Sequence, residues 1–243
     1  MSASRLATLI RERQPCVVLT GAGVSTESGI PDFRSPTGIW ADIDPVEVAS
    51  IEAFRRDPAR VWEFYGRRLG MLGVIRPNAG HYAIVELERR GLVDAVVTQN
   101  VDGLHQQAGS REVVEVHGSL ATAVCPGCGA RVPVAEVREL LDTTPVPLCV
   151  ECDTPLKPGV VMFGELLPVA AIDRATSLAR GAGLVLVVGS SLEVWPVAGL
   201  PLEADAFAIV NLGPTTLDDR AVLKIEAGAG ETLAAVVAEL PEH

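Results

Sequence analysis

Short apolar runs alternate with helical patterns along most of this chain, and this alternation restricts the fold more than any other feature. The runs that indicate buried strands cover residues 16–20, 93–98, 113–116, 184–188, 206–211 and 222–225. Helical patterns lie between several of them, at residues 81–90 after an Asn78 cap, 170–180 and 231–240. Buried strands that alternate with helices predict an α/β fold built on a doubly wound, Rossmann-like parallel sheet.

Two segments interrupt the alternation. Residues 35–76 have a mostly helical pattern, with Pro45 and Pro58 at the expected first turns, and residues 124–157 are rich in Cys, Pro and Gly. We interpret both as insertions that together form a smaller helical and metal-binding domain. The large domain is then expected to comprise residues 1–34, 77–123 and 158–243.

Charge and hydropathy narrow the class of protein. The 243 residues carry a formal net charge of −11, which argues against nucleic acid as a partner, because phosphate binding depends on Lys and Arg. No stretch approaches the roughly 18 apolar residues of a membrane span. Residues 1–15 are typical of a surface helix and not of a secretory signal, so we expect a cytoplasmic protein. The sequence leaves the oligomeric state open.

Four of the five cysteines form two C-x-x-C pairs, Cys125 with Cys128 and Cys149 with Cys152, separated by twenty residues. This spacing is typical of a zinc site, and four thiolates fill a tetrahedron without leaving a position for water or substrate. We therefore predict one structural zinc ion, with an iron–sulfur cluster or a redox dithiol as alternatives. Cys16 lies in the first apolar run and is predicted to belong to the core.

A glycine-rich turn follows the first apolar run. Gly21 and Gly23 allow a sharp turn and close approach of a ligand, and the next residues could open a helix whose free N–H groups attract phosphate. The dinucleotide fingerprint G-x-G-x-x-G is incomplete, because Thr26 stands at its third glycine. A tight turn without any ligand is the alternative.

Polar residues follow two further apolar runs. Gln99, Asn100 and Asp102 come directly after residues 93–98, and His117 ends the next run. The carboxyl ends of parallel strands line one crevice, so these side chains are expected to face the glycine turn, and an imidazole suits a base at neutral pH. The alternatives are a structural histidine and an ordinary Asn-x-Asp turn.

Several motifs together resemble one family. They are GAGVSTESGIPDFRS at 21–35, TQNVDGLHQQAG at 98–109, VHGS at 116–119, the four cysteines, PGVVMFGE at 158–165, VGSSLEVWPVAGLP at 188–201 and VNLGPT at 210–215. In this order they resemble the sirtuins, which are NAD-dependent protein lysine deacylases. The resemblance implies that an acylated lysine and NAD give free lysine, nicotinamide and O-acyl-ADP-ribose.

The resemblance also implies roles for individual residues. His117 would be the general base, with Asn100 and Asp102 holding the ribose and the nicotinamide carboxamide. Residues 31–34 would form a lid in which Phe33 screens the nicotinamide site. The implied NAD-binding set is Gly21, Ala22, Gly23, Thr26, Asp32, Phe33, Arg34, Trp40, Gln99, Asn100, Val101, Asp102, Gly189, Ser190, Ser191, Asn211, Leu212, Gly213 and Ala229.

The resemblance further concerns the substrate. Val160 and Phe163 would lie in a segment that binds the acylated peptide as an extended strand. Tyr65 and Arg68 form a Tyr-x-x-Arg pair, and Ala49 lies upstream, as in the sirtuins that remove malonyl and succinyl groups. From spacing alone, Arg68 would instead be a solvated helix residue beside Arg67.

Two other functions compete with deacylation. A mono-ADP-ribosyltransferase could use the same NAD crevice and pass the ribosyl group to a protein side chain. A zinc-ribbon adaptor without catalytic activity is the other alternative, and the acidic charge of the chain argues against its nucleic-acid form.

Overall fold

A six-stranded parallel sheet forms the centre of the large domain. The computed structural model describes residues 2–240. The strands are β1 (Cys16–Thr20), β2 (Ala95–Thr98), β3 (Val113–Glu115), β7 (Leu184–Val188), β8 (Phe207–Val210) and β9 (Leu223–Ile225). Their order is β3-β2-β1-β7-β8-β9, and every neighbouring pair is parallel. The predicted doubly wound sheet is confirmed, and its strand order reverses between β1 and β7.

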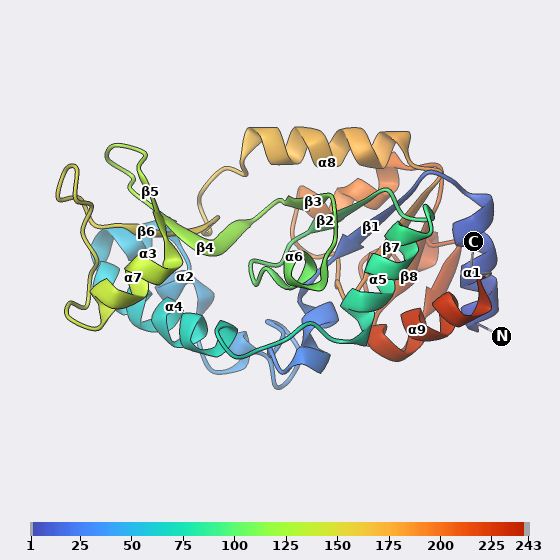
Figure 1. Cartoon of the computed structure of the whole chain (residues 1–243), viewed down its shortest axis with the longest axis horizontal. Helices are drawn as coiled ribbons and strands as arrows, with labels where there is room; N and C mark the ends of the chain where they lie inside the picture. The colour runs from blue at the N-terminus through green and yellow to red at the C-terminus, as the bar shows by residue number, and fades with distance from the viewer. Residues whose placement is uncertain (1, 241–243) are drawn as a thin grey trace.

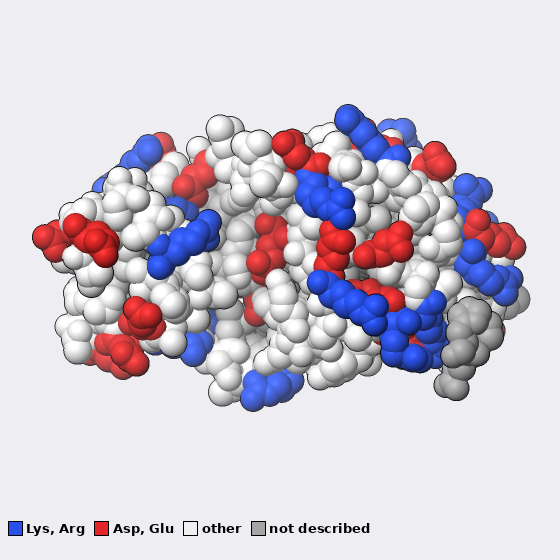
Figure 2. All heavy atoms as spheres, turned by 45° about the horizontal axis from the view of Figure 1, so that its top comes forward, with Lys and Arg blue, Asp and Glu red and all other residues white. Residues whose placement is uncertain are grey.

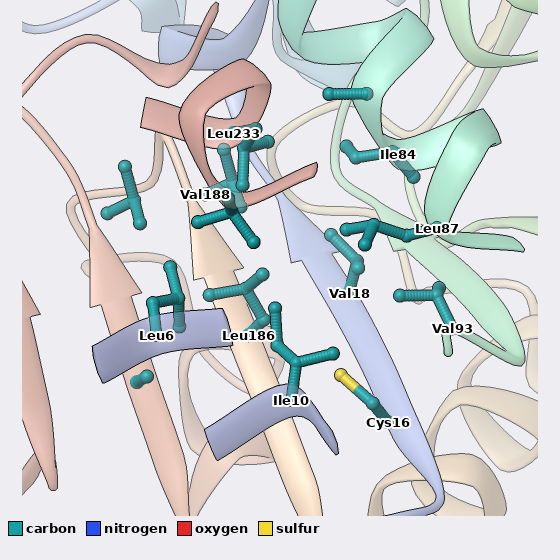
Figure 3. Packing of buried hydrophobic residues seen from close by; sticks show 14 of the residues in the cluster. Leu6, Ile10, Cys16, Val18, Ile84, Leu87, Val93, Leu186, Val188 and Leu233 are labelled. Carbon is teal, nitrogen blue, oxygen red and sulfur yellow. The ribbon is translucent and has the colours of Figure 1, made fainter. Parts of the chain in front are cut away.

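Helices cover both faces of this sheet (Figure 1). On one face lie α1 (Ser2–Glu12), α5 (Ala79–Arg89) and α9 (Ala229–Glu239), and on the other lie α8 (Val169–Gly181) and the 3₁₀ helix η3 (Val197–Glu203). Figure 3 shows the core under the first group, where Leu6, Ile10, Ile84, Leu87 and Leu233 meet Val18, Leu186 and Val188. Successive side chains of β1 point alternately into the two cores. Burial on both faces therefore fixes the register of β1.

The helices predicted at 81–90, 170–180 and 231–240 are confirmed, with small shifts of their ends. Asn78 caps α5, since its Oδ1 accepts a hydrogen bond of 2.9 Å from the backbone N–H of Gly80. Helix α9 starts at Ala229, two residues earlier than predicted. The helix expected after the glycine turn is present, and it is the 3₁₀ helix η1 (Ala22–Ser28) and not an α-helix.

The two insertions share one hydrophobic core, on the left in Figure 1. The helices are α2 (Pro45–Val48), α3 (Ile51–Arg56), α4 (Pro58–Leu72) and α7 (Val134–Leu141), and the antiparallel strands are β4 (Gly118–Val124), β5 (Arg131–Pro133) and β6 (Lys157–Val160). Pro45 and Pro58 are first helical residues, as predicted. The Trp62 indole N–H donates to the carbonyl of Leu156 at 2.7 Å, which links both insertions, while the exact domain limits stay a prediction.

Three short elements complete the described chain. They are α6 (Leu104–Ala108), η2 (Ile39–Ala41) and η4 (Asp218–Arg220). Across residues 2–240, no helix combines the length and the apolar character that a membrane crossing requires.

The four predicted metal ligands converge in the small domain. All four Sγ atoms lie within 4.8 Å of one another, with 3.4 Å between Cys125 and Cys152 and 3.6 Å between Cys128 and Cys149. Zinc–thiolate bonds of about 2.3 Å in a tetrahedron place sulfurs about 3.8 Å apart, so the geometry fits one zinc ion. Cys16 lies apart from them in the sheet core, where burial raises its thiol pKa to about 12.

We predict that Cys149→Ser abolishes stoichiometric zinc binding and loosens the segment from β4 to β6, because metal binding and local folding are coupled. Metal analysis combined with amide hydrogen exchange of residues 118–160 measures both effects. Cys16→Ala is the matched control, since it removes a buried thiol and should leave one zinc ion per chain. Unchanged exchange protection in the metal-free protein would contradict the prediction.

Candidate active site

The site begins where the backbones after β1 and β7 touch. The N–H of Gly23 donates to the carbonyl of Gly189 at 2.8 Å. A Cβ atom on Gly23 would lie 2.8 Å from the Gly189 Cα, and one on Gly189 would lie 2.2 Å from the Val24 nitrogen. Gly189 also has a φ of +63°. Only glycines permit this approach, which joins the two strand ends at the point where the sheet order reverses.

A cavity of about 1020 Å³ opens beside this contact. On the face shown in Figure 2, a hollow separates the two lobes, with acidic side chains in and beside it. All predicted catalytic, NAD-binding and acyl-binding residues line this one cavity: Gly21, Ala22, Gly23, Thr26, Asp32, Phe33, Arg34, Trp40, Ala49, Tyr65, Arg68, Gln99, Asn100, Val101, Asp102, His117, Val160, Phe163, Gly189, Ser190, Ser191, Asn211, Leu212, Gly213 and Ala229.

Asn100 and Asp102 are held in place by a serine that the sequence interpretation missed. The side-chain amide of Asn100 donates to the Gly21 carbonyl and to Ser25 Oγ, both at 3.1 Å. Ser25 Oγ in turn donates to Asp102 Oδ2 at 2.8 Å, and Asp102 Oδ1 accepts the backbone N–H of Leu104. Ser25 lies inside the glycine-rich motif, and that position was the only signal that could have indicated it.

His117 lies at the wall of the cavity with its ring orientation fixed. Its Nδ1 lies 3.2 Å from the carbonyl oxygen of Gln99, an acceptor, so Nδ1 carries the proton and Nε2 is left with its lone pair. Burial lowers the pKa of His117; the Gln99 hydrogen bond raises it and the nearby Arg34 lowers it. The imidazole is therefore neutral near pH 7 and able to accept a proton.

The loop of residues 30–40 covers part of the cavity. Asp32 Oδ1 accepts the N–H groups of Arg34 and Ser35, which shapes the turn, and the Arg34 guanidinium pairs with Glu193 at 3.1 Å. The Phe33 ring stacks on Trp40 at a centroid distance of 5.2 Å. The Arg34–Glu193 pair connects the loop to the segment that follows β7.

Arg68 of α4 reaches this aromatic group from the small domain. Its Cζ lies 5.1 Å from the centroid of the Phe33 ring and 5.7 Å from that of Phe64, distances at which a cation is attracted to an aromatic face. Burial lowers the pKa of Arg68 and raises that of the adjacent Tyr65 to about 12. Within residues 2–240, no carboxylate forms an ion pair with Arg68.

Ala49 is buried next to the segment that is predicted to bind peptide. The N–H of Phe163 donates to the Ala49 carbonyl at 2.9 Å, and the Phe163 carbonyl accepts the N–H of Ile51 at 3.0 Å. The Phe163 side chain itself is exposed. The backbone of Phe163 is thus fixed by the small domain while its side chain remains exposed.

At the other end of the cavity, hydrogen bonds order the loops after β7 and β8. Gln99 Nε2 donates to Ser190 Oγ at 2.9 Å, and the Asn211 amide donates to the carbonyls of Leu212 and Gly213. Glu27 also lines the cavity, and its carboxylate accepts the backbone N–H of Gly230 at the start of α9. The sequence interpretation did not identify Glu27.

Comparisons with known proteins agree with this geometry. A family model described as the Sir2 family matches residues 21–196. The chain is 46% identical over 239 residues to NAD-dependent protein deacylase 2 of Pyrobaculum aerophilum, covering 97% of this chain and 94% of that protein. It is 44% identical to NAD-dependent protein deacylase 2 of Archaeoglobus fulgidus, covering 97% of this chain and 95% of the relative.

Solved structures are similar over nearly the whole chain. One is a Sir2 protein with a deacetylated p53 peptide and 3′-O-acetyl ADP ribose, with a TM-score of 0.94, 39% identity and coverage of 98% of both chains. Another is a Sir2 protein bound to a propionylated peptide, with a TM-score of 0.90, 38% identity and the same coverage. The family model spans most of the sequence, and both relatives match nearly all of it. The chain therefore belongs to the Sir2 family of NAD-dependent protein deacylases.

Proposed function

We propose that this protein uses NAD to remove succinyl and malonyl groups, as well as acetyl groups, from lysine side chains of proteins. The products are free lysine, nicotinamide and O-acyl-ADP-ribose. One observation carries the preference for acidic acyl groups: Arg68 extends into the cavity beside Tyr65 without a carboxylate partner among residues 2–240.

Arg68 differs in this respect from its neighbour on the same helix. Arg67 is exposed and pairs with Glu63 at 2.5 Å, as an ordinary surface arginine does. Arg68 is half-buried, and a buried guanidinium requires an anionic partner or hydrogen-bond acceptors. A terminal carboxylate of the acyl group would supply two charge-assisted hydrogen bonds, each contributing about 1.5–3 kcal/mol. An acetyl group would leave the guanidinium without this partner.

The polar residues at the strand ends would orient NAD for cleavage. Asn100 and Asp102, fixed through Ser25, would hold the ribose and the nicotinamide carboxamide. Departure of nicotinamide needs orientation and exclusion of water more than a strong acid, because the ring is a cationic pyridinium in NAD and leaves as a neutral molecule. The Phe33 ring, stacked on Trp40, would provide that exclusion as part of the lid.

His117 would then act on the ribose. Its free Nε2 would take a proton from a ribose hydroxyl after the acyl oxygen has attacked the anomeric carbon. The Gln99 carbonyl holds the other ring nitrogen, so the imidazole keeps its orientation while it gains a proton. The four cysteines have no open coordination position, so their zinc ion would stabilise the small domain and take no part in the chemistry.

The acylated substrate would bind as an extended strand. Val160 and Phe163 line the cavity, and so do Glu193 to Trp195. An extended peptide between two such segments gains backbone hydrogen bonds on both sides, which favours recognition of the acyl-lysine over a particular sequence. The similar Sir2 structures with bound peptides support this arrangement.

We predict that Arg68→Met lowers kcat/KM for a succinyl-lysine peptide by about tenfold to a hundredfold, the loss expected for one charge-assisted hydrogen bond. Turnover of the matching acetyl-lysine peptide should fall far less. Product analysis by mass spectrometry measures both rates. Arg67→Met is the matched control and should leave both rates near wild type. Equal loss of both activities in Arg68→Met would contradict carboxylate recognition.

We predict that the acidic limb of the kcat/KM profile has its midpoint below pH 6.5, because burial lowers the pKa of His117 from that value. His117→Asn should reduce deacylation by about a hundredfold or more, as expected for loss of a general base. A limb centred above pH 6.5, or substantial turnover by His117→Asn, would reject the assignment of the base.

We predict that Phe33→Ala leaves the fold intact and raises the ratio of nicotinamide exchange to deacylation, because the lid then screens the cleaved site less well. Exchange of isotope-labelled nicotinamide into NAD, measured beside deacylation, gives this ratio. If the ratio does not change, Phe33 does not act as the screen.

A further inference from the structure

A buried lysine comes directly before the segment that would bind the acylated peptide, and the chemistry proposed above does not use it. Lys157 of β6 is 8% exposed. Its ammonium group donates to the Val160 carbonyl at 2.6 Å, to the Pro158 carbonyl at 3.0 Å and to Glu165 Oε2 at 3.0 Å. An ammonium group has three hydrogens, so every one of them has an acceptor within the protein and none is left for a substrate atom.

Glu165 connects Lys157 to the backbone of the same segment. The Glu165 Oε2 atom that accepts from Lys157 also accepts the backbone N–H of Met162 at 2.8 Å. The N–H of Glu165 donates in turn to the Met162 carbonyl at 3.0 Å. Both backbone polar groups of Met162 therefore bond to Glu165, and Lys157 holds the carboxylate oxygen that makes the first of these bonds.

The other backbone bonds of this segment lead to parts of the candidate active site. The N–H of Val161 donates to the backbone carbonyl of His117 at 2.8 Å, and the N–H of Phe163 donates to the small domain at 2.9 Å. Met162 lies between these two fixed residues, and its side chain is buried. Residues 160–165 all line the cavity. A shift of Met162 would therefore move the cavity wall between the candidate base and the small domain.

The ion pair of Lys157 and Glu165 is unlike a surface pair. Their side chains are 11% and 25% exposed, whereas those of the paired Arg180 and Glu203 are 67% and 41% exposed. Water weakens an exposed pair and leaves little net stabilisation. A largely buried carboxylate that loses its cationic partner keeps an uncompensated charge, which strongly destabilises its surroundings. Lys157 is therefore required for residues 160–165 to keep this arrangement.

We propose that Lys157, acting through Glu165, positions residues 160–165 to receive the acylated peptide. Lys157 is a positioning residue, because all hydrogens of its ammonium group are bonded to protein acceptors. The inference rests on the proposed function in one respect, the binding of the peptide by this segment. The hydrogen bonds of Lys157 and Glu165 do not depend on that assignment.

Amide hydrogen exchange followed by NMR tests the arrangement without any assay of activity. Met162 lies outside the strands, and its N–H donates to the Glu165 carboxylate. We expect this amide to be protected in the wild-type protein and to exchange faster in Lys157→Met, while protection of β1 and α5 stays unchanged. An unprotected Met162 amide in the wild type, or equal protection in both proteins, would overturn the proposal.

Steady-state kinetics with an acetyl-lysine peptide test the effect on the substrate independently of Arg68. Lys157→Met keeps the apolar stem and removes the ammonium group. KM for the peptide should rise about tenfold, the loss expected for a hydrogen bond to a charged group, while KM for NAD stays near wild type. Arg180→Met is the matched control and should leave both values unchanged, since it removes an exposed pair. An equal rise of both KM values in Lys157→Met, or lower stability with an unchanged KM for the peptide, would indicate packing alone and overturn the role.

A second substitution tests whether Lys157 acts through Glu165. Glu165→Gln keeps an oxygen acceptor for the Met162 N–H and removes the charge that requires a cation. Lys157→Met should therefore raise KM for the peptide much less in the Glu165→Gln background than in the wild type. Effects that simply multiply would overturn the proposal. Failure of the proposed function would look different, since the wild-type protein would then release no nicotinamide from NAD with an acyl peptide.

Discussion

The backbone contact between Gly23 and Gly189 is the constraint on which the site depends. It joins the loops that follow β1 and β7, two strands that pair in parallel at the place where the strand order reverses. A side chain on either glycine would collide with the opposite backbone. The neighbouring strands β2 and β3 end at the same edge of the sheet. The residues that follow them therefore lie near this contact, and Asn100 and His117 line the same cavity.

The small domain completes that cavity from the other side. Its core combines α4 with the segment that carries the cysteines, so one hydrophobic cluster positions both the zinc ligands and the helix of Arg68. The Arg68 guanidinium lies over Phe33 of the loop that covers the site. The residues that we propose for acyl recognition and for screening of the cleaved site are therefore in physical contact, and one helix connects them to the metal-binding segment.

Much of the fold could be predicted because its signals are local. The six buried strands, the Asn78 cap and the two helix-starting prolines depend on patterns of a few residues, and the structure has them within two or three positions. The glycine turn was harder to interpret from the sequence. A glycine is needed at position 23 because its backbone contacts Gly189, which lies far away in the sequence. Ser25 and Glu27 were missed for the same reason, since their contacts with Asp102 and Gly230 exist only in the folded chain.

The account depends most on transfer of an acidic acyl group from lysine to ADP-ribose. Mass spectrometry of a reaction with NAD and a succinyl-lysine peptide tests this directly, with an acetyl-lysine peptide and a reaction lacking NAD beside it. The account predicts free lysine peptide together with nicotinamide and O-succinyl-ADP-ribose, formed only when NAD is present. A peptide that keeps its succinyl group, or a protein that becomes ADP-ribosylated without loss of acyl, would contradict it.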